Sequence, residues 1–110
     1  MNNLVNSVNL IGNLGSDVDF KVVGAKQNKL ARVNLATNDV SYDQNGQKQV
    51  ETQWHTIVGW GKIAERMQVF GKKGKRWAIQ GKLEHRSFED PAGNKRYYTE
   101  VVVREFMMLN

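Results

Sequence analysis

One short helical pattern interrupts a chain that otherwise has the alternation of β-strands. In residues 62–70, Ile63, Met67 and Phe70 recur at i, i+4 and i+7, which is the spacing of an amphipathic helix. Gly71 follows, and we expect it to end this helix in the left-handed conformation. Strand patterns cover residues 2–14 with an extension over 17–23, then 30–37, 50–60, 75–89 and 95–106.

Five strands with a single helix between the third and the fourth match the OB-fold, a small five-stranded barrel. We therefore predict a mainly β protein, an OB-fold barrel with one short α-helix between strands 3 and 4. The 110 residues suit one domain with one core, so residues 1–110 are taken as a single domain. A small β-sandwich is the alternative, but it does not require a helix at this place.

Three polar segments are expected to connect the strands. Residues 24–29 and the stretch Pro91–Asn94 are predicted to be turns. Residues 39–49 are predicted to form a longer loop around the turn pair Asn45-Gly46. A loop of this length is often functional.

The charge balance suits an acidic partner, although charge alone is weak evidence. The chain carries 16 Lys and Arg against 11 Asp and Glu, a net charge of +5, and positive potential attracts phosphate. There is no cysteine, and His55 and His85 have no metal-ligand spacing around them. Gly71–Lys75 lacks the spacing of a phosphate loop. We expect no enzyme activity, metal or cofactor, and, without a signal peptide or membrane span, a cytoplasmic location.

The tryptophans of the third strand are the first candidates for a binding surface. Trp54 and Trp60 have the same parity, so a regular strand places them on one face, about 20 Å apart. Separated rings on one face can stack on the bases of a single strand. Two core aromatics are the alternative, and a bulge near Gly59 could turn one ring to the other face.

In the middle of the fourth strand, the odd-numbered residues of 77–83 are apolar and the even-numbered residues of 82–86 are charged. The apolar parity, predicted to face the core, contains Trp77, Ile79, Gly81 and Leu83. The charged parity contains Lys82, Glu84, Arg86 and Phe88. An apolar ring among cations suits a surface that binds both bases and phosphates. A subunit contact is the alternative for Phe88.

The fifth strand adds two tyrosines of opposite parity. Tyr97 alternates with Val101 and Val103 and is predicted to lie in the core. Tyr98 shares its parity with Glu100 and is predicted to be exposed. The candidate phosphate contacts lie on exposed faces and turns, and ordinary solvated charge is the alternative for them: Lys62, Lys72, Lys73, Arg86, Lys95 and Arg96.

A set of short motifs runs through nearly the whole chain. In order, they are Val8–Gly15 followed by Asp17, Leu35–Thr37, Gln47–Gln49, Glu51–His55, Gly61–Glu65, Lys73-Gly74, Gly81–Leu83, Gly93–Tyr97, Thr99–Val103 and Met107–Leu109. Together they resemble the bacterial single-stranded DNA-binding protein family. The resemblance implies an OB-fold that assembles as a homotetramer and wraps single-stranded DNA during replication, recombination and repair, in the cytoplasm and associated with the nucleoid.

The resemblance also assigns roles to individual residues. The base-stacking aromatics of the family correspond to Trp54, Trp60 and Phe88. A further family aromatic corresponds to Ser41, and the neighbouring Tyr42 is a candidate to replace it. His55 corresponds to a histidine near the subunit contact.

The end of the sequence differs from the family pattern. Family members usually continue into a glycine-rich extension with an acidic tip that recruits other proteins, whereas this sequence ends at Asn110. Either the sequence is a shortened piece of a longer protein or it is a short natural relative, and only in the second case is recruitment of repair and replication enzymes through such a tip not expected.

The predicted function is binding of single-stranded DNA with little sequence preference. Three alternatives stay open at this point. The chain could be a tailless paralogue similar to primosomal replication protein n, dimeric and with a protein partner, or an RNA-binding OB module. It could also be a structural OB module whose aromatics serve assembly only.

Overall fold

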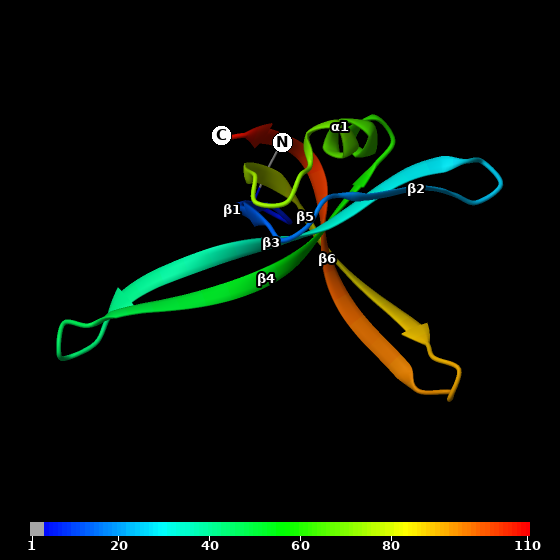
Figure 1. Ribbon diagram of the computed structural model, residues 1–110. Coiled ribbons are helices and arrows are strands. Elements are labelled where there is room, and N and C mark those ends of the chain that lie inside the picture. Colours follow the sequence, from blue (N-terminus) through cyan, green and yellow to red (C-terminus); the bar gives the residue numbers. More distant parts are fainter. Residues whose placement is uncertain (1–3) are drawn as a thin grey trace.

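The computed structural model describes residues 4–110, and its strands form one strongly curved sheet (Figure 1). The elements are, in order, β1 (Val8–Leu14), β2 (Asp19–Val23), β3 (Asn28–Tyr42), β4 (Lys48–Trp60), α1 (Lys62–Phe70), β5 (Arg76–Glu89) and β6 (Lys95–Met108). Neighbouring strands follow the order β1-β5-β6-β4-β3-β2, and a further pairing joins β1 to β3. The pairings thus lead from β1 through β5, β6, β4 and β3 back to β1. β2 is a sixth strand beside β3, because the chain turns after Gly15 where the sequence suggested a break.

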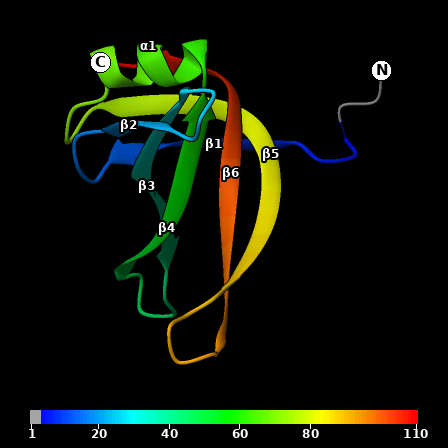
Figure 2. The same ribbon diagram turned by 90° about the vertical axis from the view of Figure 1, so that its right-hand side faces the viewer.

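The core lies inside this curved sheet, where apolar residues of one parity meet. Trp77 is completely buried and stacks on Phe106, with ring centroids 4.4 Å apart. α1 adds Ala64 and Met67 to the same cluster. It lies at the end of the barrel opposite to the tips of the β3–β4 and β5–β6 hairpins (Figure 2). Burying these rings and aliphatic side chains is the main driving force for the fold.

The predicted helix is confirmed over residues 62–70, but its end differs from the prediction. Gly71 has φ −92°, so it is not left-handed. It is needed for close packing instead, because a Cβ there would collide with Val18 Cγ2 and lie 2.5 Å from the Met67 carbonyl oxygen. The left-handed glycine of this turn is Gly74, with φ 87°.

The predicted loop over residues 39–49 is wrong in its extent. β3 continues to Tyr42 and β4 begins at Lys48, with these two residues in register. Only the tip is a turn, in which the Asp43 carboxylate accepts hydrogen bonds from the backbone N–H groups of Asn45 and Gln47, both at 2.9 Å. The hairpin extends beyond the barrel with both faces exposed, so its strands lack the apolar alternation by which strands are recognised.

Two burial predictions in β5 and β6 are wrong. Leu83 and Tyr97 were expected in the core but are 42% and 74% exposed. Glu100, which shares the parity of the exposed Tyr98, is nevertheless 1% exposed. Leu83 and its register partner Val101 lie where the two strands leave the barrel, and beyond them the inward side of the second hairpin is exposed (Figure 1). Glu100 is buried because neighbouring arginines cover it, as described below.

A β-bulge lies where this hairpin joins the barrel. The register shifts between Gln80, which pairs with Glu105, and Gly81, which pairs with Val103. The extra residue lets Val103 and Phe106, which differ in parity, both enter the core. β6 also continues to Met108, two residues beyond its predicted end.

The first strand begins later than predicted. Of the expected range 2–14, residues 2 and 3 lie outside the described part of the chain, and β1 begins at Val8. Asn6 bonds with its side chain to both backbone groups of Leu83, at 3.0 and 2.8 Å, in place of strand pairing. Within residues 4–110, no helix has the length and apolar character required to cross a bilayer.

Candidate nucleic-acid interface

The strand register places both tryptophans of β4 on the side of the sheet away from the core. Trp54 is opposite Ala36 and Trp60 is opposite Leu30. The residues of the other parity, such as Leu35 and Ile57, belong to the core cluster. Trp54 is 61% exposed and Trp60 is 37% exposed. The two rings therefore share a face and are accessible to a ligand.

Trp54 is held in place by a glycine from a neighbouring segment. Gly15 follows β1 and donates its backbone N–H to the Asn34 carbonyl at 2.9 Å. A Cβ at Gly15 would lie 2.5 Å from Trp54 Cζ3 and 3.0 Å from Cη2. The six-membered ring of the indole therefore lies directly against the Gly15 backbone, which supports its orientation while most of its surface stays open.

Tyr42 extends the same face toward the tip of the first hairpin. It is opposite Lys48, and the even-numbered positions of β3 and β4 lie on one side of the sheet, so Tyr42 points to the side of Trp54. Tyr42 is 68% exposed. Ser41 points to the other side. The geometry thus places Tyr42, and not Ser41, in line with the two tryptophans.

The second hairpin continues this surface. Phe88 and Tyr98 contact each other edge to face, with centroids 5.7 Å apart, and both are exposed. β4 and β6 pair in parallel, with Thr56 opposite Glu100, so the even-numbered faces of the two hairpins are continuous. We call this surface the outer face; its aromatic residues are Tyr42, Trp54, Trp60, Phe88 and Tyr98. The hairpins diverge below the barrel, so the outer face is forked (Figure 1).

Two arginines and two glutamates occupy the base of the fork. Glu100 accepts a hydrogen bond from Arg32 Nη2 at 2.9 Å, and Arg86 Nε lies 3.0 Å from its other oxygen without hydrogen-bond geometry. Arg86 Nη2 also lies 2.9 Å from Glu84 Oε1. Arg86, a predicted phosphate contact, is therefore paired with two carboxylates.

The other predicted phosphate contacts border the outer face. Lys62 follows Trp60 by two residues at the start of α1. Lys72 and Lys73 lie in the α1–β5 turn, whose Gly74 donates to the carbonyl of Leu14, the neighbour of Gly15. This turn is therefore close to Trp54. Lys95 and Arg96 lie at the tip of the second hairpin, where Arg96 is in register with Phe88. Within residues 4–110, none of the lysines in this set has a carboxylate at ion-pair distance.

The tip of the second hairpin is organised by Asp90. Its carboxylate accepts backbone hydrogen bonds from Asn94 at 2.9 Å and Ala92 at 3.0 Å, and it pairs with Arg96 Nε at 3.0 Å. The Asn94 N–H, with help from Arg96 and Ala92, holds the pKa of Asp90 below its ordinary value. Arg96 is thus oriented by Asp90, although much of its side chain stays exposed.

The histidines lie away from the outer face. His55 is opposite Leu35 on the core side of the sheet, and its Nε2 shares a hydrogen bond with Thr37 Oγ1 at 2.9 Å. His85 Nδ1 lies 2.8 Å from Thr99 Oγ1 on the second hairpin. In the described part of the chain, no three His, Asp or Glu side chains come together in a group that could hold a metal ion. The expected role of His55 at a subunit contact stays a prediction.

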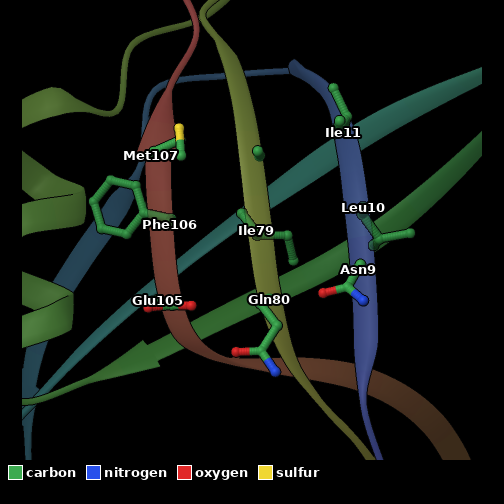
Figure 3. A pocket seen from close by; sticks show the side chains of 9 residues that line it. Asn9, Leu10, Ile11, Ile79, Gln80, Glu105, Phe106 and Met107 are labelled. Atoms are coloured by element: carbon green, nitrogen blue, oxygen red, sulfur yellow. The ribbon is translucent and has the colours of Figure 1, made fainter.

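A separate apolar surface crosses β1, β5 and β6 (Figure 3). Ile11, Ala78 and Met107 are in register on adjacent strands, and Ile11 and Met107 are 54% and 62% exposed. Glu105 supplies the one charged side chain among the described residues that line this shallow hollow. This surface lacks the cations that a nucleic acid requires, so it suits a protein partner better.

Reasoning from the sequence missed three residues of the site. Arg32 alternates with the core residues Ala31 and Val33, so its outward direction could have been found from parity. The support of Trp54 by Gly15 and the burial of Glu100 depend on contacts between distant segments, and no local pattern indicates them.

Comparison with known proteins agrees with this geometry. The model of the "Single-strand binding protein family" matches residues 5–109. "Single-stranded DNA-binding protein 1" of Chlorobaculum tepidum is 39% identical over 106 residues, which are 96% of this chain and 65% of that protein. The Xylella fastidiosa protein of the same name is also 39% identical, with 96% and 77% covered. This chain thus spans about two thirds of the length of the Chlorobaculum relative.

Solved structures show the same architecture. The "Plasmodium falciparum SSB complex with ssDNA" superposes with a TM-score of 0.85 at 28% identity and covers 100% of both chains. A deletion mutant of the single-stranded DNA binding protein from Thermus aquaticus gives 0.82 at 27% identity, over 96% of this chain and 51% of that one. The OB-fold expected from the sequence is confirmed, and this chain belongs to the single-strand binding protein family.

Proposed function

We propose that this protein binds single-stranded DNA with little sequence preference and protects it during replication, recombination and repair. The observation that carries the proposal is the forked outer face, on which five exposed aromatic side chains are bordered by lysines without carboxylate partners in the described chain. Every base has a π-face, so stacking on rings is tolerant of sequence. Lysines at the border supply the phosphate contacts, which are also independent of sequence.

The shape of the outer face favours single strands over duplexes. The two hairpins diverge below the barrel (Figure 1), so the rings that they carry lie on separate arms, which a flexible strand with unstacked bases can follow. Bases in a duplex are stacked on each other and offer no free faces to Trp54 or Phe88. The names of the relatives and of the Plasmodium complex support the same ligand.

The deciding experiment is a fluorescence titration with oligo-dT, the same length of duplex DNA, and oligo-U. We expect strong binding of oligo-dT, weak binding of the duplex, and affinity that falls as the salt concentration rises. Equal affinity for duplex and single strand would contradict the proposal. Tighter binding of oligo-U than of oligo-dT would assign the surface to RNA. If none of the three ligands binds, the exposed aromatic residues serve subunit assembly only.

We also propose that the protein assembles as a homotetramer. β1 pairs with β3 only through Asn13 and Leu14, so the rest of this edge of β1 has no partner strand in the described chain. The adjacent apolar surface of Ile11, Ala78 and Met107 is exposed. Open strand edges and apolar patches are typical of subunit contacts.

Light scattering tests the assembly directly. We expect four subunits at micromolar concentration in moderate salt, and fewer subunits for Met107→Glu, which places a charge in the apolar surface. Glu51→Gln, on the first hairpin far from this surface, is the control and should leave the mass unchanged. A monomeric wild-type protein would refute the proposal.

A further inference from the structure

The ion-pair cluster of Arg32, Glu84, Arg86 and Glu100 occupies the middle of the outer face, at the base of the fork. Glu100 is in register with Thr56 on β4 and with Glu84 on β5. Thr56 follows Trp54 by two residues, and Tyr98 precedes Glu100 by two residues. A nucleic acid strand that passes from Trp54 to the second hairpin must therefore cross this cluster.

The two glutamates of the cluster differ in burial and in their contacts. Glu100 is 1% exposed and lies within 3.0 Å of the guanidinium groups of both Arg32 and Arg86. The Glu84 side chain is 35% exposed and, among residues 4–110, its one ion pair is with Arg86, at 2.9 Å. Separating a buried carboxylate from its arginines is costly, whereas an exposed pair of this kind contributes little. Glu84 can therefore leave Arg86 at small cost, and Glu100 cannot.

A phosphate can take the place of the carboxylate that leaves. Guanidinium groups bind carboxylates and phosphates through the same planar N–H donors. Arg86 is 39% exposed in its side chain, so the donor at Nη2 is accessible once Glu84 moves away. Lys82, on the same side of β5 two residues before Glu84, offers a cation near which the released carboxylate can settle.

We propose that Glu84 occupies a phosphate subsite on Arg86 when DNA is absent, and that a backbone phosphodiester displaces it. Glu100 remains in place and acts as a positioning residue that keeps Arg86 and Arg32 fixed at the fork. This inference rests on the proposed function, because the ligand of the subsite is the DNA backbone. It makes Glu84 an internal competitor of DNA.

The test makes the same charge change at two glutamates, of which Glu84 pairs with Arg86 and Glu51 accepts a hydrogen bond from Gln53. Glu84→Gln removes the competing charge, and Glu51→Gln makes the same charge change on the first hairpin, on the side away from the outer face. Affinities for oligo-dT are measured at about 0.15 M salt, where charges more than about 8 Å apart are largely screened. We expect Glu84→Gln to bind about two- to fivefold more tightly than Glu51→Gln, the range that an exposed ion pair supports. Glu84→Ala repeats the comparison without the glutamine amide, whose oxygen could still accept a hydrogen bond from Arg86.

The same comparison in an Arg86→Ala background identifies the contact. Without the guanidinium group there is no subsite to compete for, so the difference between Glu84→Gln and Glu51→Gln should vanish. Equal affinities of the two variants in the wild-type background, or a gain that persists without Arg86, would overturn the inference. A wild-type protein that does not bind oligo-dT would overturn the proposed function itself, so the two failures are distinguishable. Melting temperatures of all variants verify that each is folded.

Discussion

Gly15 lies under the ring of Trp54, and replacing it by alanine offers a sharp test of the outer face. The added methyl carbon would lie 2.5 Å from Cζ3, and carbon atoms in contact normally lie about 3.5–4.0 Å apart. The ring must therefore move by about 1 Å or more. The Asn34 carbonyl, the nearest backbone atom to this methyl, is 3.6 Å away and does not obstruct it.

The expected effects on binding and on stability are opposite. Stacking of a base on an aromatic platform contributes about 1–3 kcal/mol, and a displaced ring should lose part of this, so we expect about fivefold weaker binding of oligo-dT. Gly15 does not have positive φ, so alanine is compatible with its backbone and should restrict the unfolded chain. We therefore expect a free energy of unfolding that is unchanged or raised by up to about 1 kcal/mol.

The assay combines oligo-dT titration with thermal unfolding and tryptophan emission. Trp54→Ala supplies the matched background, because without the ring the nearest atom to the methyl group of Gly15→Ala is the Asn34 carbonyl oxygen at 3.6 Å, an ordinary contact. In that background, Gly15→Ala should change the affinity no further. Unchanged affinity of the Gly15→Ala variant with a shifted emission spectrum would show that the position of Trp54 does not matter for binding. The reasoning about the outer face would then be refuted.

Four further outcomes follow from the same structure. Trp54→Ala should weaken oligo-dT binding about 5- to 150-fold and lower stability by only about 1–2 kcal/mol, whereas the buried Trp77→Ala should cost about 3–5 kcal/mol of stability, as chemical unfolding can measure. Oligo-dT should quench the emission of Trp54 and Trp60 but leave that of Trp77, so quenching that reaches completion would contradict the assignment. The logarithm of affinity should fall with the logarithm of salt concentration with a slope of about −0.7 for each phosphate neutralised. Because the pKa of Asp90 is lowered in the folded protein, the Asp90 carboxylate stabilises the hairpin tip fully at any pH above its ordinary pKa. This stabilisation is lost as the pH falls through the lowered pKa, and NMR of the Asn94 amide should detect the loss.

The sequence predicted the barrel well because one face of each barrel strand rests on a common core. Trp77 and Ile79 alternate with less buried neighbours, and this period of two is a local property of the chain. The helix over residues 62–70 was equally visible, because its apolar spacing is local too. Each of these elements buries apolar residues on one side, such as Ile79 of β5 and Met67 of α1, although Phe70 at the end of the helix is exposed.

The same pattern failed where the hairpins leave the barrel. Leu83 and Tyr97 have the parity of core residues, but Leu83 lies at the edge of the barrel and Tyr97 lies beyond it, and the sequence does not say where the barrel ends. The bulge after Gln80 also changes the relation between parity and direction. A pattern gives the side to which a residue points, whereas burial depends on what other segments bring to that side.

In the candidate site, too, some residues can be identified from local patterns and others depend on contacts between distant segments. Trp54, Trp60 and Phe88 could be proposed from parity and from the family motifs, because each is a single ring on a recognisable strand. The cluster around Glu100 could not, since Arg32 lies 68 residues away in the chain and meets it only through the parallel pairing of β4 with β6. Parallel pairing between distant strands has no local sequence signature.

The arrangement of charge explains how one surface can hold DNA without selecting a sequence. At the base of the fork, two arginines are balanced by two glutamates, so the middle of the outer face adds no net charge. The lysines at the border add positive charge, which attracts the backbone at a distance. At the centre of the outer face, close contacts with DNA are made by the rings, which accept any base, and by Arg86, whose carboxylate partner a phosphate can replace. Long-range attraction and close contact are therefore assigned to different residues, and neither of them depends on the identity of the base.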